Sequence, residues 1–314
     1  MSRPLEARAF APASVGNVAV GFDVLGHAVG ALGDRVSVRR LAEPVVRIAA
    51  VEGAESPLPL DPERNTAGMA LVAMRRELGL SFGFEARVEK GVPLSAGLGG
   101  SACSAVAAVV AANALLDEPL AHEKLLGFAV QGEAVASGST HADNVAPSLL
   151  GGLVLVLEHP TPRVVRVPVP SNVRCVLAHP HIRVDTREAR RILSPSVDRQ
   201  AFVAQCANLA GFLAGCYSGD LRLLAACLAD VVIEPQRRGL IPGFDRVKAA
   251  ALEAGALGCS ISGAGPTLFA WAEDERAEAV RAAMAAAFEG AVPGVDTWVC
   301  PVEPVGARLL EPHE

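Results

Sequence analysis

Hydrophobic and polar residues alternate along three segments in the first third of the chain, as they do in strands with one buried face. These segments are Arg35–Arg40, Val45–Val51 and Phe82–Glu89. A period of two places successive side chains on opposite faces of a sheet. We therefore predict a strand for each segment, and we expect the first two to form an antiparallel pair.

Longer segments carry the pattern that is typical of helices. The spacing predicts helices over Asn65–Leu78, His122–Ala136, Gln200–Tyr217 and Glu273–Phe288. One further helix is expected over Ser101–Leu116, and its residues are apolar on nearly every side. A helix without a polar face is buried, so this helix should lie inside the molecule.

Strands and helices are mixed in both halves of the chain, which predicts an α+β fold with two layers. A length of 314 residues is large for a single hydrophobic core. The proline-rich stretch His159–Pro162 is the first candidate for a boundary between domains. We therefore expect an N-terminal domain over residues 1–162 and a C-terminal domain over residues 163–314.

Composition excludes several classes of function. The net charge is −6 and no basic stripe is present, which argues against a nucleic-acid partner. The seven cysteines are scattered and none forms a Cys-x-x-Cys pair, so we expect reduced thiols in a cytoplasmic protein. The most membrane-like run, Ser101–Leu116, is shorter than the roughly 20 apolar residues that a membrane span needs. We expect no membrane partner.

A glycine-rich stretch, Pro93–Ser104, directly precedes the apolar helix. Glycines allow backbone N–H groups to converge on an anion, and the N-terminus of a helix adds partial positive charge. The stretch lacks the Gly-Lys-Ser/Thr of a P-loop and the Gly-x-Gly-x-x-Gly of a dinucleotide site. A plain turn at the start of the helix, with Ser101 as N-cap, explains the glycines equally well.

Three motifs resemble those of the GHMP kinases, the family of galactokinase, homoserine kinase, mevalonate kinase and phosphomevalonate kinase. Pro93–Ser104 matches the central motif, except that Gly100 stands where serine is usual and Cys103 where alanine is frequent. Gly258–Thr267 is similar to the third motif, and Ala11–Gly26 resembles the first motif in the form that homoserine kinases carry. The motifs follow the family order.

The resemblance implies an N-terminal domain like ribosomal protein S5 domain 2 and a ferredoxin-like C-terminal domain, with ATP at their junction. The nucleotide-binding positions that it implies are Asn65, Pro93, Leu94, Ser95, Ala96, Gly97, Leu98, Gly99, Gly100, Ser101, Ala102, Cys103 and Ser104. It also implies Mg²⁺ held by Ser101 and Glu133. Without the family, a lone helical glutamate would be a solvated surface charge.

In homoserine kinases the corresponding residues meet an amino-acid substrate, and the resemblance therefore implies phosphorylation of the hydroxyl of L-homoserine by ATP. The substrate-binding positions that it implies are Asn17, Asp23, His141, Thr186, Arg190, Arg237 and Arg238. The choice between the two neighbouring arginines stays open. Outside the family context, Asn17 and Asp23 would be turn residues, and the histidine and arginines would be surface side chains.

The catalytic candidates that the resemblance implies are Asp143, Asn144 and Arg190. Mevalonate-type relatives use an aspartate base at a position like Asp143, whereas homoserine kinases place an asparagine near the accepting hydroxyl. We expect Asn144 to orient that hydroxyl. The alternatives are another GHMP kinase, acting on mevalonate, a sugar or shikimate, and a non-catalytic relative of RNA-binding ribosomal modules. Members of the family are often dimers, which leaves a homodimer open.

Overall fold

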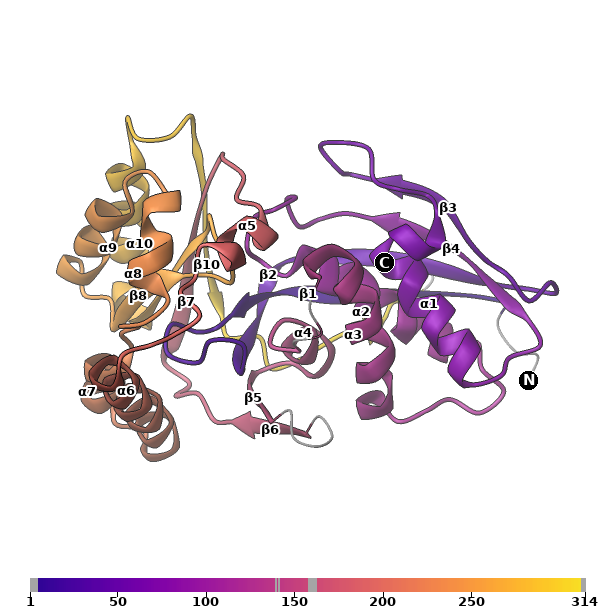
Figure 1. Ribbon diagram of the computed structural model, residues 1–314, viewed down its shortest axis with the longest axis horizontal. Coiled ribbons are helices and arrows are strands. Elements are labelled where there is room, and N and C mark those ends of the chain that lie inside the picture. The colour runs from indigo at the N-terminus through magenta and orange to yellow at the C-terminus, as the bar shows by residue number, and fades with distance from the viewer. Residues whose placement is uncertain (1–4, 139, 141, 158–162, 312–314) are drawn as a thin grey trace.

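The computed structural model describes residues 5–138, 140, 142–157 and 163–311 of the chain. Two sheets, each flanked by helices, confirm the predicted mixture of α and β structure (Figure 1). One sheet has seven strands and belongs mainly to the first half of the chain. The other has four strands and belongs to the second half.

The larger sheet is organised around one long strand, β2, which pairs with three neighbours. Its main path runs β11-β1-β2-β4-β3, while β5 pairs with the start of β2 and β6 pairs with β5. The strands are β1 (Glu6–Gly16), β2 (Leu25–Leu41), β3 (Val46–Glu52), β4 (Gly83–Glu89), β5 (Leu153–Leu157), β6 (Arg163–Val167) and β11 (Arg308–Leu309).

One expectation for this sheet is wrong. β2 and β3 do not pair, because β4 lies between them and runs parallel to β3. Alternation identifies a strand without identifying its partner, and the helix that connects β3 to β4 permits the parallel pairing. The first strand, β1, contains Pro12 and continues to Gly16, with a register shift between Pro12 and Ala13. Proline has no N–H to donate to the ladder, and irregular positions of this kind tolerate it.

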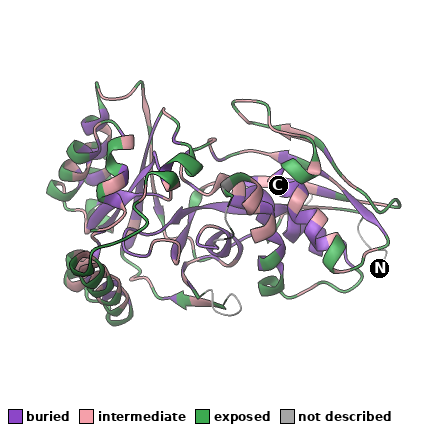
Figure 2. Ribbon diagram, viewed as in Figure 1, coloured by how far each residue is buried: buried purple, intermediate pink, exposed green. Residues whose placement is uncertain are grey.

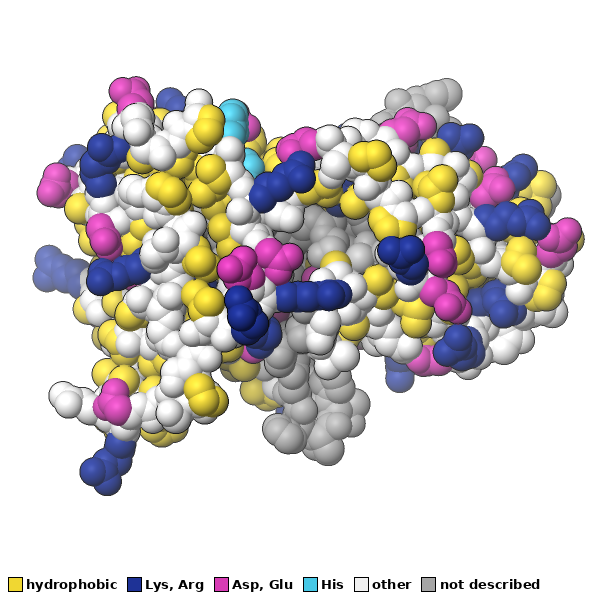
Figure 3. Space-filling model, turned by 45° about the horizontal axis from the view of Figure 1, so that its top comes forward, with side chains coloured by type: hydrophobic (Ala, Val, Ile, Leu, Met, Phe, Trp, Pro, Cys, Tyr) yellow, Lys and Arg dark blue, Asp and Glu magenta, His cyan; other side chains and the backbone are white. Residues whose placement is uncertain are grey.

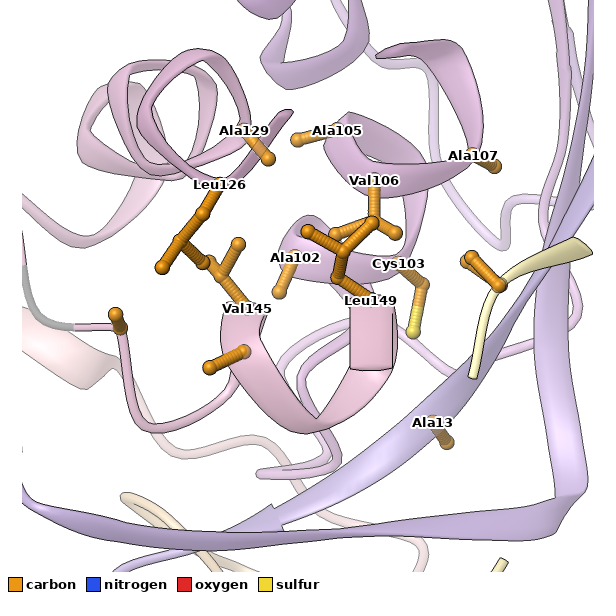
Figure 4. Close-up of a cluster of buried hydrophobic side chains, with 14 of the residues drawn as sticks. Ala13, Ala102, Cys103, Ala105, Val106, Ala107, Leu126, Ala129, Val145 and Leu149 are labelled. Atoms are coloured by element: carbon orange, nitrogen blue, oxygen red, sulfur yellow. The ribbon is translucent and has the colours of Figure 1, made fainter. Parts of the chain in front are cut away.

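Helices α1 (Thr66–Glu77), α2 (Gly100–Asn113), α3 (Leu126–Ser137) and α4 (Val145–Leu150) pack together beside β1 and β2. The short 3₁₀ turns Pro62–Arg64 and His122–Leu125 lead into α1 and α3. As predicted, α2 is buried: every residue from Ala102 to Asn113 is inaccessible or nearly so. Figure 4 shows its small side chains against α3 and α4, which allows the helices to approach closely.

The smaller sheet is fully antiparallel, with the order β10-β7-β9-β8. Its strands are β7 (Val173–Pro180), β8 (Gly258–Ile261), β9 (Leu268–Glu273) and β10 (Val295–Pro301). Helices α9 (Phe244–Glu253) and α10 (Asp274–Phe288) cover one face. The remaining helical segments are α5 (Thr186–Arg191), α6 (Arg199–Ser218), α7 (Leu221–Cys227), α8 (Glu234–Arg237) and the 3₁₀ turn Arg238–Leu240. Figure 2 shows α6 and α7 as the most exposed helices of this half.

The two halves share a buried junction. Trp271 of β9 donates its indole N–H to Nε2 of His27 on β2 across 3.2 Å, and both side chains are fully buried. β6 and β11, although they lie beyond residue 162, pair with strands of the larger sheet. The predicted division at 162/163 therefore falls between two paired strands, and its proline-rich segment lies outside the described residues.

The surface offers no single-signed stripe on the face in Figure 3, where acidic and basic side chains are interspersed. Within the described ranges, every helix is too short or too polar to span a bilayer.

Candidate active site

The glycine-rich segment leads directly into α2 and opens onto a well-formed hollow at the start of that helix. Helix α2 begins at Gly100, and its N-cap, Gly99, has a left-handed backbone with φ of 64°. No side chain among the described residues caps this helix end. Its N–H groups are therefore available to an anion, and the alternative in which Ser101 is the N-cap is wrong.

This hollow, which we call the loop cavity, has a volume of about 460 Å³. Nine residues of Pro93–Ser104 line it: Pro93, Leu94, Ser95, Ala96, Gly97, Gly99, Gly100, Ser101 and Ser104. The other three, Leu98, Ala102 and Cys103, have their side chains in the hydrophobic core. The sequence predicted one continuous binding segment, and the structure divides it into a lining part and a packing part.

Asn65 also lines the loop cavity, and its side chain is already engaged in local structure. Its Oδ1 accepts the N–H groups of Ala67 and Gly68 at 3.0 and 3.2 Å, so it caps α1. Its Nδ2 donates to the carbonyl of Pro59 at 2.9 Å. This asparagine therefore shapes the cavity wall by fixing the start of α1.

Glu133 and Ser101, the predicted metal-binding pair, both line the loop cavity and hydrogen-bond to each other. The pKa of the Glu133 carboxyl is raised to about 7, chiefly by burial; the Ser101 hydrogen bond and the charge of Lys90 oppose this shift, and Asp143 adds to it. A carboxylate and a hydroxyl are suitable oxygen ligands for Mg²⁺ bound mainly by phosphates and water. The described residues contain no cluster of three His, Cys, Asp or Glu side chains that would form a metal cage.

A buried ion pair lies beneath the first turn of α2. The ammonium of Lys90 pairs with Oδ2 of Asp34 and donates to the Gly100 carbonyl at 2.6 Å. The side chains are 4% and 0% exposed, respectively. A Cβ built on Gly100 would lie 3.2 Å from Cγ1 of Val92, which is close without being prohibitive. Packing at this position therefore does not require the glycine that stands in place of the family serine.

A second, smaller hollow of about 60 Å³, which we call the acceptor cavity, adjoins the loop cavity. It brings together the following predicted residues from distant parts of the sequence: Asn17, Asp23, Glu133, Asp143, Asn144, Thr186, Arg190 and Arg237. Phe22, Gly263 and Ala264 complete its lining. The motif resemblance assigned these residues to one active site, and the structure brings them to one cavity.

Asp23 and Arg190 form a two-pronged ion pair in the acceptor cavity. The guanidinium nitrogens donate to Oδ1 and Oδ2 of Asp23 at 2.7 and 2.9 Å. The hydrogen bonds to Asp23 raise the pKa of Arg190 further above its usual value. Asn17 fixes this loop, since its Oδ1 accepts the N–H of Asp23 and its Nδ2 donates to the Gly263 carbonyl at 2.9 Å. This pair therefore presents one carboxylate and one guanidinium, whose charges complement the ammonium and carboxylate of a zwitterion.

The loop that carries Asn17 and Asp23 has a strained backbone. Asn17, Val18 and Ala19 are consecutive residues with φ of 69°, 43° and 56°, and Asp23 has φ of 61°. For residues other than glycine, this left-handed conformation costs roughly 1–2 kcal/mol of free energy per residue. Strain of this kind is typical of functional segments that the surrounding structure holds in place.

The structure separates the two neighbouring arginines. Arg237 is buried and lines the acceptor cavity, where it donates to the carbonyls of Ala189 and Gly263 at 3.0 and 3.1 Å. Burial, assisted by the nearby Arg190, lowers its pKa. Arg238 is exposed and pairs with Asp245 at 3.2 Å. Of these two neighbours, Arg237 alone lines the acceptor cavity.

Asn144 lies where the two cavities meet, and its neighbour Asp143 lines the acceptor cavity. Glu133, Asn144, Thr186, Gly263 and Ala264 line both of them. Asp143 is buried, and its Oδ2 accepts from Nδ2 of Asn144 at 3.3 Å. A group that bridges the cavities would pass beside this amide. His141, which was also predicted to contact substrate, lies outside the described residues.

Sequence reasoning missed several residues of the site. Gly263 accepts from Asn17 and Arg237 and donates to the Gly16 carbonyl, so it joins the strained loop to the third motif. Its motif was recognised, but nothing in a glycine turn indicates such contacts. Arg183 and Arg187 line the loop cavity from the second half of the chain, and they carry no sequence signal beyond their charge.

Comparison with known proteins agrees with this geometry. Residues 65–152 match the family model for the GHMP kinases N terminal domain, and residues 212–290 match that for the GHMP kinases C terminal. A homoserine kinase from Xylella fastidiosa (strain M12) is 55% identical over 97% of this chain and 94% of its own length. One from Xanthomonas campestris pv. campestris (strain B100) is 53% identical over the same shares.

Solved structures of GHMP kinases have the same fold as this chain. A homoserine kinase from Cytophaga hutchinsonii superposes with a TM-score of 0.94 at 43% identity and covers 99% of both chains. A galactokinase from Lactococcus lactis, at 15% identity and a TM-score of 0.72, shares the fold alone. The uncapped helix start, the two adjoining cavities and these matches together establish that the chain belongs to the GHMP kinase family.

Proposed function

We propose that the chain transfers the γ-phosphoryl group of ATP to the side-chain hydroxyl of L-homoserine, giving O-phospho-L-homoserine. The observation that carries this proposal is the wall that the loop cavity and the acceptor cavity share, with Asn144 and Thr186 on it. In-line phosphoryl transfer requires donor and acceptor to meet at one point. The full-length relatives at 53–55% identity are homoserine kinases, which supports the choice of acceptor.

The acceptor cavity suits an amino acid by its charges. The Asp23 carboxylate is the partner for the substrate ammonium, and Arg190 with Arg237 is the partner for its carboxylate. In the structure Asp23 and Arg190 satisfy each other. Substrate binding would therefore exchange one ion pair for two. An acceptor that carries only one of the two charges would separate Asp23 from Arg190 and leave one of them without a partner.

Catalysis in this proposal depends on positioning more than on proton abstraction. Asn144 orients the accepting hydroxyl, and Asp143 holds the Asn144 amide by accepting from Nδ2. Replacement of Asp143 by Asn keeps an acceptor oxygen for Nδ2 of Asn144 and should therefore retain most turnover. A fall in kcat of several orders of magnitude in Asp143→Asn would instead assign Asp143 as a general base.

Mg²⁺, which would enter with ATP, is assigned to Ser101 and Glu133 at the start of α2 and on α3. When bound there, it would neutralise negative charge on the phosphates. Its positive charge would also offset the mutual repulsion of Glu133 and Asp143, which contributes to the raised pKa of Glu133.

An acceptor panel tests the proposal. ADP release from ATP and Mg²⁺ is measured with homoserine, mevalonate, galactose or shikimate offered in turn. We expect release with homoserine, and we expect Arg190→Ala to raise the KM for homoserine more than the KM for ATP. Release with another acceptor alone would overturn the choice of substrate while leaving the kinase assignment intact.

A further inference from the structure

Ser14 of β1 lies fully buried against the point where the two cavities meet, although no motif argument gave it a role. Its hydroxyl donates to Oδ1 of Asn144 at 3.0 Å. Its backbone N–H donates to the carbonyl of Leu98, within the glycine-rich segment, at 3.1 Å. One residue thus joins the central strand, the phosphate-binding segment and the asparagine on the shared wall.

The two hydrogen bonds of the Asn144 side chain fix which end of the amide faces which way. An ionised carboxylate only accepts, so Oδ2 of Asp143 selects the Nδ2 end. The Ser14 hydroxyl donates to the opposite end, Oδ1. A rotation of the amide by half a turn would place Oδ1 against the carboxylate, which has no proton to donate, whereas the Ser14 hydroxyl could accept from Nδ2 as well as donate to Oδ1. The aspartate therefore selects the amide orientation, and the hydrogen bond from Ser14 holds the amide in it.

Glycine backbone encloses this pair on two sides. A Cβ built on Gly99 would lie 2.2 Å from Oγ of Ser14, and one on Gly16 would lie 2.6 Å from Nδ2 of Asn144. The hydroxyl thus packs directly on the backbone of the phosphate-binding segment. Little freedom remains for the Asn144 side chain while both hydrogen bonds are made.

We propose that Ser14 is a positioning residue for phosphoryl transfer, which holds the Asn144 amide in the orientation that the accepting hydroxyl requires. The inference rests on the proposed role of Asn144 in the transfer. Ser14 itself lines neither cavity. Its effect should therefore appear in turnover and should leave the binding of both substrates nearly unchanged.

The chain provides a matched control in Ser148 of α4. This serine is also fully buried, and its hydroxyl donates to the carbonyl of Pro12, on the same strand as Ser14, at 2.8 Å. Ser148→Ala therefore removes a comparable buried hydrogen bond and leaves both hydrogen bonds of the Asn144 side chain in place. Melting temperatures of both variants report the structural part of each change.

The test is a double-mutant cycle in the full chain, run with the acceptor that the wild type phosphorylates. We expect Ser14→Ala to lower kcat by about 10- to 100-fold, with each KM within about twofold and with Ser148→Ala close to wild type. Ser14→Cys, which fills the space with a weak donor, should lose kcat similarly and guards against a folding defect. In an Asn144→Ala background, the further change Ser14→Ala should have no effect on kcat.

Two results would overturn the inference. One is an unchanged kcat in Ser14→Ala, and the other is an equal loss of kcat with and without Asn144. Either result leaves the proposed reaction standing, because that reaction is tested by the turnover of the wild type alone.

Discussion

The ion pair between Asp34 and Lys90 lies beneath the glycine-rich segment and is the most deeply buried ion pair among the described residues. It therefore gives the sharpest prediction of how a substitution changes the free energy of unfolding. Oδ1 of Asp34 accepts the N–H groups of Gly91 and Val92 at 2.9 and 3.2 Å. Its Oδ2 accepts from Lys90 and from the Ser104 hydroxyl. The substitution Asp34→Asn keeps an acceptor for the backbone groups but leaves the Lys90 charge without its counter-ion.

The magnitude follows from burial. Removal of one partner of a buried ion pair costs about 3–5 kcal/mol, since the remaining charge stays out of water. Lys90 cannot reach solvent easily, as its side chain is 4% exposed. We therefore expect Asp34→Asn to lower the free energy of unfolding by about 3–5 kcal/mol. The KM for ATP should also rise, because Lys90 donates to the Gly100 carbonyl at the start of α2.

Urea unfolding followed by circular dichroism measures the change in the free energy of unfolding. The matched control is Glu85→Gln, which breaks the exposed Arg39–Glu85 pair on neighbouring strands and should cost less than about 1 kcal/mol. The double variant Asp34→Asn with Lys90→Met should lose less than the sum of the two single changes, because no lone charge remains. A loss below about 1 kcal/mol in Asp34→Asn, or strict additivity, would refute this reasoning.

Three further predictions address single residues. Arg237→Ala should raise the KM for homoserine at least about tenfold, whereas Arg238→Ala should change it less than about twofold; steady-state kinetics with equal effects would contradict the placement of the two arginines. Gly100→Ser should change the KM for ATP by about twofold or less, since the new Cβ would lie 3.2 Å from Cγ1 of Val92 and 3.5 Å from Nζ of Lys90, and neither contact is prohibitive; a large rise would show that the loop requires glycine. Burial lowers the pKa of His27 to about 4, from 6.5, so the unfolded chain binds the proton more tightly and stability falls as the pH drops through that window. Between about pH 7.5 and about pH 5, the wild type should lose about 2 kcal/mol more than His27→Gln in urea unfolding, and parallel curves would contradict this.

Sequence patterns predicted those parts of the molecule in which one physical constraint acts on many residues. The apolar helix after the glycine segment was predicted because its burial requires nearly every position to be small and apolar. The convergence of Asn17, Asp23 and Arg190 was predicted through motif resemblance, since no periodicity connects residues so far apart in the chain.

The remaining features depend on contacts that the chain order does not encode. Arg237 and Arg238 are adjacent and chemically identical, and only the turn at the end of α8 decides which of them is buried. The position of β4 between β2 and β3 depends on a parallel pairing that alternation does not reveal. Ser14 is one small residue inside a strand, and its relation to Asn144 joins residues 130 positions apart.

A ³¹P NMR spectrum of the chain with ATP, Mg²⁺ and L-homoserine tests the proposed reaction most directly, because it identifies the phosphorylated atom as well as the loss of ATP. We predict a new phosphomonoester signal coupled to the methylene protons next to the former hydroxyl, growing in step with ADP. Accumulation of inorganic phosphate alone, or an unchanged ATP spectrum, would contradict phosphoryl transfer at the wall that the two cavities share.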